Sequence, residues 1–157
     1  MNGVKNLTNS NYILTKAKDN NIPEILELTL GMWHEAQTFY PMYNKNLMVR
    51  FMKPIVNNGN CLILIKDKKI VGTIGGVVAR WWFAESEYFA DAFFFVEKEH
   101  RSFQNARALI QGLNKIAKTK NIPLVMGTFD ANDIERKDML FEKLNFRKLG
   151  IRYGYGL

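Results

Sequence analysis

The stretch of residues 96–106 holds the clearest signal for chemistry, because an apolar run ends there and a helical pattern begins. The N-terminus of a helix points several backbone N–H groups outward, and their aligned dipoles attract phosphate oxygens without requiring any particular side chain. We therefore expect this junction to be able to bind a pyrophosphate.

A strand leads into this junction. Residues 87–96 form a run rich in aromatic side chains, and residues 92–96 are apolar on both alternating faces. Such a strand is expected to be covered on both sides, as in the middle of an α/β sheet. Asp91 is a carboxylate in this segment, where burial is costly. It stands out equally as a functional group and as a hydrogen-bonded structural aspartate.

The elements around this strand alternate short strands with helices. Before it, the patterns predict a strand at 12–15, a helix starting near 19–24, a second helix within 37–56 that carries Leu47, Phe51 and Ile55 on one face, and a hairpin of 61–65 and 70–79. After it, they predict a helix around 106–117, a strand at 122–128, a helix at 132–144 and a last strand within 146–155.

Length and composition fit one domain over residues 1–157, since 157 residues with 47% hydrophobic content leave no room for a second. No run approaches the roughly 18 apolar residues of a membrane span, and the polar start lacks the layout of a signal peptide. We expect a cytoplasmic protein without a membrane partner. The net charge of +7 favours an anionic partner, which nucleic acid, an anionic lipid surface or a phosphorylated cofactor would each satisfy.

Metal and nucleophile chemistry find little support. The chain has one cysteine, Cys61, in an apolar run that suits a small hydrophobic residue in a strand. His34 and His100 are far apart and form no ligand cluster or catalytic triad with it. We expect no metal.

Two motifs resemble those of the GNAT superfamily of N-acyltransferases. Its acetyl-CoA motif is a hydrophobic-x-Val strand end followed by Arg or Gln, two residues, Gly, one residue, and Gly or Ala. Phe94, Phe95, Val96, Arg101 and Ala106 stand at matching places. The segment LFEKLNF at 140–146 resembles the late family motif Leu-Tyr-Glu-Lys-Leu-Gly-Phe. The order of the elements also fits the superfamily, in particular its compact stand-alone bacterial and phage members.

Three positions depart from the family pattern. Gln104 stands where glycine is usual, which puts the geometry of the phosphate loop and its cofactor affinity in question. Phe141 replaces a tyrosine whose hydroxyl is thought to protonate the departing CoA thiolate, so another acid or solvent would have to serve. Asn145 replaces a glycine, but asparagine also tolerates the left-handed conformation that closes a helix.

The resemblance implies an α/β (α+β) fold with a mixed, mostly antiparallel twisted sheet, flanking helices and splayed central strands that form the acyl-CoA cleft. It implies acetyl-CoA as cosubstrate, bound by the strand end and by the loop and helix start that follow: Phe94, Phe95, Val96, Arg101, Ser102, Phe103, Gln104, Asn105, Ala106 and Arg107. Among side chains, Arg101 is the first candidate for the phosphates, with Lys98 and Arg107 behind it, although charged residues at a helix start are more often solvated.

The reaction implied is direct attack of a primary amine on the thioester, assisted by a base. Asp91 is the first candidate, followed by Glu35, which the resemblance places in a Met-x-x-Glu segment, and Glu87 near the start of the same strand. Aromatic residues in segments that flank the acceptor cleft of the family could contact the acceptor: Trp33, Phe39, Tyr40, Trp81 and Trp82.

Two readings from other classes stay open. One is an acyl-CoA-binding protein on the same fold without catalysis, which Gln104 and Phe141 make concrete. The other, disfavoured by the lack of any RNP-like, zinc-finger or helix-turn-helix signature, is a basic nucleic-acid-binding domain. The acceptor, the acyl chain length and the choice between monomer and homodimer do not follow from the sequence.

Overall fold

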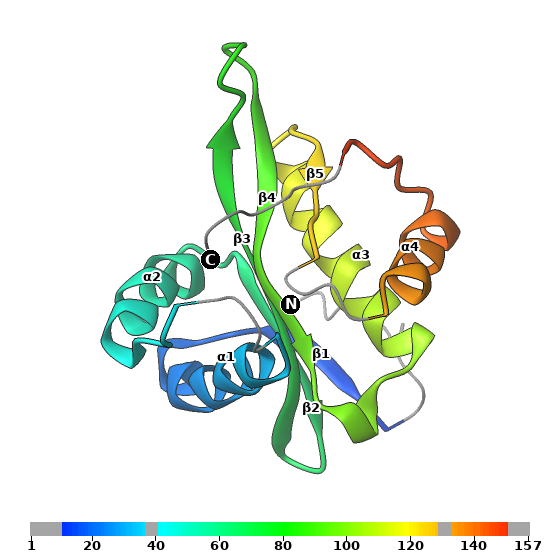
Figure 1. Ribbon diagram of the computed structural model, residues 1–157. Helices are drawn as coiled ribbons and strands as arrows, with labels where there is room; N and C mark the ends of the chain where they lie inside the picture. The colour runs from blue at the N-terminus through cyan, green and yellow to red at the C-terminus, as the bar shows by residue number, and fades with distance from the viewer. Residues whose placement is uncertain (1–10, 37–40, 129–132, 151–157) are drawn as a thin grey trace.

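A computed structural model describes residues 11–36, 41–128 and 133–150 (Figure 1). Five strands form one sheet in the order β1-β2-β3-β4-β5. Their bounds are β1 Ile13–Lys16, β2 Cys61–Lys66, β3 Lys69–Arg80, β4 Glu87–Val96 and β5 Leu124–Val125. Neighbouring strands are antiparallel except for β4 and β5, which are parallel. This confirms the mixed, mostly antiparallel sheet expected from the sequence.

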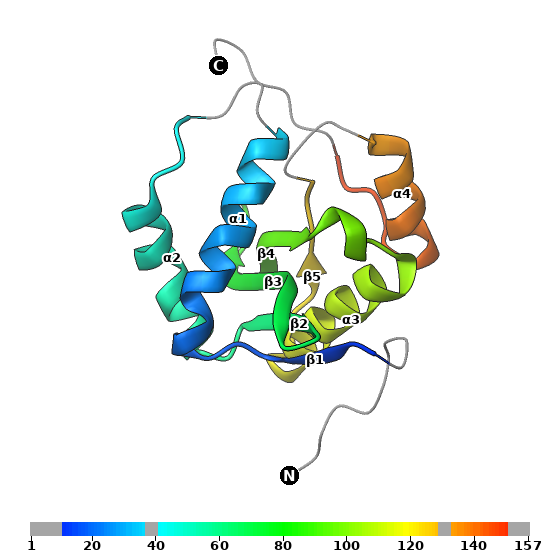
Figure 2. The ribbon, with the colours of Figure 1, turned by 90° about the horizontal axis from the view of Figure 1, so that it is seen from below.

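Helices cover both faces of the sheet. On one side lie α1 (Ile22–Ala36) and α2 (Lys45–Asn57), and on the other α3 (Phe103–Thr119) and α4 (Ile134–Lys143), as Figure 2 shows from below. Short 3-10 turns precede α1 at Asp19–Asn21 and α3 at Lys98–His100. The core is accordingly split into two clusters of buried residues, one beneath α1 and α2 and one beneath α3.

The β2–β3 hairpin forms as predicted. Asp67 and Lys68 have φ values of 47° and 69°, and Lys66 pairs with Lys69. Two consecutive residues with positive φ in a two-residue loop make a turn whose twist matches that of the flanking strands. The charged residues lie in the turn, and the apolar residues of the strands on either side contribute to the core.

Strand β4 contains a β-bulge opposite two glycines of β3. Gly75 of β3 pairs with Phe93, and Gly76 pairs with Asp91, so Ala92 is the extra residue. A Cβ atom at either glycine would come closer than 3.0 Å to an aromatic ring, that of Phe93 at Gly75 and that of Phe89 at Gly76. The rings lie in different core clusters, Phe93 on the α1 side and Phe89 on the α3 side. Strand β4 is thus covered on both sides, as predicted.

Several elements differ from the sequence prediction. The second helix lies where it was predicted, at Lys45–Asn57, but on it Leu47 and Phe51 of the predicted face are exposed, while Met52, Ile55 and Val56 are buried. Strand β5 is only two residues long because it soon diverges from β4. Residues 146–150 are not in a strand, and the remainder of the expected last strand lies outside the described residues.

Candidate functional site

Strands β4 and β5 separate after a short contact. They pair at Phe89 with Leu124 and at Ala90 with Val125, and the Phe89 N–H donates to the Pro123 carbonyl at 2.8 Å. Beyond Ala90, β4 has no strand partner on this side within the described part of the chain, although its pairing with β3 continues to Val96. The result is an open edge along the last part of β4, as expected for splayed strands.

The backbone of the open edge presents hydrogen-bonding groups. The Glu97 N–H donates to the Val71 carbonyl at 2.9 Å, which turns the peptide groups of Glu97 toward β3. Because these groups alternate in direction along an antiparallel strand, those of Phe94 and Val96 point away from β3 and toward the gap. The Val96 carbonyl there accepts a hydrogen bond from Arg101 Nε at 2.8 Å.

Asp91 lies where the strands begin to separate. Its Oδ1 accepts a hydrogen bond from the Gly127 N–H at 2.9 Å, across the gap. A Cβ added at Gly127 would meet no atom within 4 Å, so the backbone there borders open space. The half-buried carboxylate therefore stands at the inner end of the opening, and Gly127 is a partner that sequence reasoning missed.

The open edge leads to the start of α3. Ser102 is the N-cap: its Oγ accepts from the Asn105 N–H at 3.1 Å, and its carbonyl accepts from the Ala106 N–H at 3.0 Å. The Arg101 N–H donates to the Lys98 carbonyl at 3.3 Å. Within the described residues, the N–H groups of Ser102, Phe103 and Gln104 are left without a hydrogen-bond acceptor. Three consecutive amides of this kind at a helix N-terminus form an anion-binding surface.

A buried side chain holds the loop before these amides. Asn105 is 1% exposed, and its Nδ2 donates to the His100 carbonyl at 2.8 Å. The His100 ring contacts the Tyr12 hydroxyl through Nδ1 at 3.1 Å. These contacts link the loop to α3 and to the chain just before β1. The contact between Tyr12 and His100 could not be predicted from local patterns, because the two residues are far apart in the sequence.

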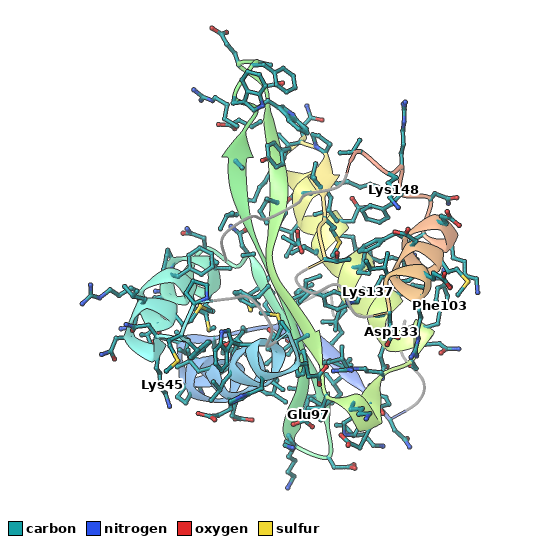
Figure 3. All side chains as sticks on the ribbon, in the orientation of Figure 1. Lys45, Glu97, Phe103, Asp133, Lys137 and Lys148 are labelled. Carbon is teal, nitrogen blue, oxygen red and sulfur yellow. The ribbon has the colours of Figure 1, made fainter. Side chains whose placement is uncertain are left out.

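Gln104 does not need the conformational freedom of glycine. It lies in the first turn of α3, is exposed, and is not among the described residues with positive φ. Its neighbour Phe103 is 39% exposed, and the Lys143 ammonium lies 5.7 Å from the centre of that ring. Figure 3 shows Phe103 on the side of the sheet occupied by α3 and α4, together with Lys137. Gln104 therefore adopts an ordinary helical backbone conformation, for which glycine is not required.

Two candidate residues from different parts of the chain meet in an ion pair. Glu35, in the last turn of α1, contacts Arg101, whose Nη2 lies 2.7 Å from each carboxylate oxygen. The Arg101 guanidinium also stacks over the Phe95 ring at 5.2 Å. The sequence predicted Arg101 as a phosphate ligand and Glu35 as a carboxylate near the reaction, but it did not predict that they contact each other.

Glu87 is placed apart from this group. It lies at the exposed start of β4, on the long β3–β4 arm that projects from the body (Figure 1), and it pairs with Arg80 at 3.4 Å. The same arm carries Trp81, stacked against Tyr88 with ring centres 4.4 Å apart, and Trp82, which is 93% exposed. Phe39 and Tyr40 lie outside the described residues.

The end of α4 explains the second motif. Asn145 has a φ of 60°, its N–H donates to the Glu142 carbonyl, and the Phe146 N–H donates to the Phe141 carbonyl, both at 2.9 Å. This pair of bonds is the Schellman closure of a helix, which needs a residue that tolerates the left-handed region. The Phe141 and Phe146 rings pack edge to face at 5.4 Å. The prediction for Asn145 is confirmed, and Phe141 brings a ring without a hydroxyl.

A groove of about 520 Å³ lies between α1 and the end of β4. Its charged lining is mainly acidic, with five glutamates and two lysines: Glu24, Glu27, Glu35, Glu97, Glu99, Lys69 and Lys98. Such a lining repels phosphate and attracts cations. Anionic groups should therefore approach the open amides from the α3 and α4 side.

Cys61 is unsuited to act as a nucleophile. Its side chain is fully buried, and burial raises the pKa of the thiol to about 11, with a smaller opposing effect from the Thr73 hydroxyl. Within the described ranges, no group of three or more His, Cys, Asp or Glu residues could hold a metal ion. No described helix is long and apolar enough to cross a membrane.

Comparison with known proteins places these features in a family. The profile of the acetyltransferase (GNAT) family matches residues 12–146. No curated protein sequence matches the chain.

Solved structures share the fold over nearly the whole chain. A predicted acetyltransferase from Clostridium acetobutylicum, solved with acetyl-CoA, has a TM-score of 0.71 at 14% identity, covering 92% of this chain and 96% of that one. AAC(6′)-Iy, in complex with the bisubstrate analog CoA-S-monomethyl-acetylneamine, has a TM-score of 0.73 at 15% identity, covering 93% and 97%. A GNAT family acetyltransferase from Staphylococcus aureus has a TM-score of 0.62 at 18% identity, covering 94% and 99%.

Proposed function

Because the chain belongs to the acetyltransferase (GNAT) family, we propose that it transfers an acetyl group from acetyl-CoA to a primary amine by direct attack. Acetyl-CoA supplies the activated thioester. The observation that carries the proposal is the run of amides at Ser102, Phe103 and Gln104, which have no acceptor among the described residues and follow the open edge of β4 after the short loop of residues 97–101. The same proposal places the reaction in the cytoplasm.

Two surfaces described above support acetyl-CoA as the cosubstrate. The amides at the start of α3 would bind the pyrophosphate, since they combine unused donors with the positive end of the helix dipole. The peptide groups of Phe94 and the N–H of Val96, whose carbonyl already accepts from Arg101, would pair with the amide groups of pantetheine, much as an added strand pairs with a sheet edge. Arg107 and Lys143 lie on the α3 and α4 side and would add positive charge.

Asp91 is our proposed general base. It lies at the inner end of the opening, and one of its oxygens is held by the Gly127 N–H, which fixes the orientation of the carboxylate. The attacking amine must be neutral, so a positioned carboxylate that takes a proton from the ammonium, directly or through water, would assist the reaction. Glu35 and Glu87 each contact an arginine instead, and we rank both behind Asp91.

The binding step is tested by calorimetric titration with acetyl-CoA, CoA and dephospho-CoA. We expect micromolar binding that weakens when the 3′-phosphate is absent, because that phosphate adds charge-assisted contacts. A wild-type protein that gives neither heat nor a thermal shift with millimolar acetyl-CoA would refute the cofactor assignment, since a ligand of the native state must stabilise it.

Turnover is tested by following CoA release with a thiol reagent over a panel of amines. The assay suits this protein because its only cysteine is buried and has a raised pKa. The panel includes polyamines, aminoglycosides, amino acids and peptides. Aminoglycosides enter because structures similar in fold include an aminoglycoside acetyltransferase in complex with sisomicin.

One observation favours a second function, acyl-CoA binding without catalysis. Phe141 packs on Phe146 and offers no hydroxyl where the family usually has tyrosine. The two functions separate cleanly: a binding protein would bind acetyl-CoA tightly yet release no CoA with any amine. Our main proposal requires that another acid or solvent protonate the thiolate, and either would permit turnover.

A further inference from the structure

The Arg101 side chain ties the loop before α3 to helix α1. Its Nη2 donates to both carboxylate oxygens of Glu35 at 2.7 Å, and its Nε donates to the Val96 carbonyl at 2.8 Å. The guanidinium lies over the Phe95 ring at 5.2 Å. A single planar group thus joins α1, the end of β4 and the residue that immediately precedes the N-cap Ser102.

This geometry limits what Arg101 does for an anion. Its positive charge is matched by Glu35, and the ring beneath it belongs to the core cluster on the α1 side, away from α3. The groove beside it is lined mainly by glutamates, which would repel phosphate. These contacts favour a structural role for the guanidinium, which links α1 to the loop before α3, over a role as a phosphate ligand.

The position of Arg101 affects the proposed anion site, because Ser102, the first of the three amides without an acceptor among the described residues, follows Arg101 directly. Fixing the Arg101 side chain at two points fixes the direction in which the chain enters α3. Side chains hold this entry: Glu35 contacts Arg101, and the Asn105 Nδ2 donates to the His100 carbonyl.

We propose that Glu35 is a positioning residue that acts through Arg101 to hold the amides of Ser102, Phe103 and Gln104 in place for the cofactor. The proposal rests on the acetyl-CoA function above and deepens it. It also gives Glu35 a different part from the proton transfer considered for it from the sequence.

The change in acetyl-CoA affinity caused by one variant of Glu35 distinguishes this positioning role from two alternatives, Arg101 as a phosphate ligand and Glu35 as the general base. Glu35→Gln keeps the side-chain shape and removes the charge, and we expect acetyl-CoA to bind about fivefold more weakly, the scale of a part-exposed ion pair. The kcat should stay unchanged, with the same pH profile. If Arg101 were a phosphate ligand, the same variant would release it and tighten binding. If Glu35 were the base, kcat would fall and the pH profile would lose its acidic limb. Either result overturns the proposal.

Coupling gives a second check. Arg101→Gln should weaken binding at least as much as Glu35→Gln, because it also removes the contacts with the Val96 carbonyl and the Phe95 ring. The double variant Glu35→Gln with Arg101→Gln should be no weaker than Arg101→Gln alone, because the contact that Glu35 makes with Arg101 is already lost. Additive losses would show that the two residues act separately. Glu27→Gln is the matched control: Glu27 lies on the same helix, lines the same groove and pairs with Lys45 at 3.2 Å.

A measurement without ligand keeps this proposal distinct from the proposed function. In Glu35→Gln, the NMR order parameters of the Ser102, Phe103 and Gln104 amides should fall from a rigid value of about 0.85 toward 0.6, while those in the middle of α3 stay constant. Unchanged order parameters would overturn the positioning role even in a protein that binds acetyl-CoA. Failure of the wild type to bind acetyl-CoA would overturn the proposed function and leave this test intact.

Discussion

The Asp91 carboxylate accepts a hydrogen bond from the Gly127 N–H at 2.9 Å, just beyond the last residues at which β4 and β5 pair. The bond crosses the gap between the two strands and replaces the ladder that ends there. Asp91 therefore combines two tasks that one substitution can separate, since holding Gly127 requires only an acceptor oxygen while proton transfer requires a carboxylate.

Asp91→Asn should separate these tasks. Asparagine can still accept the Gly127 N–H through its side-chain oxygen but cannot serve as a base, so we expect kcat to fall by about 100-fold, the usual scale of general base catalysis. Acetyl-CoA affinity by calorimetry should stay close to that of the wild type. Asp91→Ala is the comparison, because it removes both tasks and should also lower the melting temperature. Wild-type turnover in Asp91→Asn across the pH range would exclude Asp91 as the base.

Gln104 offers a test of the anion site by charge alone. Gln104→Glu is nearly isosteric, but it places a carboxylate beside the unpaired amides, and we expect acetyl-CoA to bind at least about tenfold more weakly through repulsion. Gln104→Ala keeps the backbone and should bind as the wild type does. A glutamate in the first turn of a helix is, if anything, stabilising, so unfolding would not explain the loss. Equal affinities for all three proteins would argue that the pyrophosphate binds elsewhere.

The closure of α4 predicts a difference between two small residues. Asn145 has a φ of 60°, which costs alanine about 1 kcal/mol and glycine little. Asn145→Ala should therefore lower the melting temperature by about 2–4 °C, whereas Asn145→Gly should leave it nearly constant. Thermal unfolding of the two variants measures this. A loss of the same size in both would mean that the asparagine side chain, and not its backbone conformation, stabilises the turn.

The buried thiol makes stability depend on pH in the alkaline range. Burial raises the pKa of Cys61 to about 11, whereas an unfolded cysteine ionises near 8.5. Above about pH 8.5 the thiol of the unfolded chain loses its proton while the native thiol keeps it, which favours unfolding. The contribution of the protonated thiol to the free energy of unfolding is therefore complete below about pH 8.5 and is lost as the pH rises toward about 11.

Urea unfolding of the wild type and of Cys61→Ala checks this sign. The advantage of the wild type should shrink between about pH 8.5 and 11, by at most about 3 kcal/mol, while titrations common to both proteins cancel. The native thiol should also resist iodoacetamide at pH 8 and react once the chain is unfolded. An advantage that does not vary with pH would contradict the raised pKa.

Sequence patterns predicted what is contiguous in the chain. The end of β4, the loop and the start of α3 follow one another within a few residues, so this junction of strand and helix was predictable from the local patterns. The turn at Asp67 and Lys68 was predictable from its place as a short charged segment between two apolar strands. The helix closure at Asn145 was predictable because asparagine tolerates the left-handed conformation.

Contacts between distant residues were not predictable. Glu35 and Arg101 are 66 positions apart, and Asp91 and Gly127 are 36 apart, so no local pattern indicates either pair. The apolar spacing of Leu47, Phe51 and Ile55 predicted the wrong face of α2, since only Ile55 of the three is buried. The face that packs on the core is rotated from the predicted one and runs along the helix through Met48, Val49, Met52, Ile55 and Val56. Apolar residues lie on both faces, so spacing alone does not show which of them is buried.

The open edge of β4 has a consequence for handling the protein. N–H and C=O groups on a strand edge that has no neighbouring strand are a template for pairing with another chain, and in the described part of this chain such an edge runs along β4 from beyond Ala90 to Val96. A ligand that fills the gap would remove that template. We expect solutions without ligand to aggregate on storage and CoA to suppress this at concentrations above its Kd, so that occupancy of the cleft also protects the solubility of the protein.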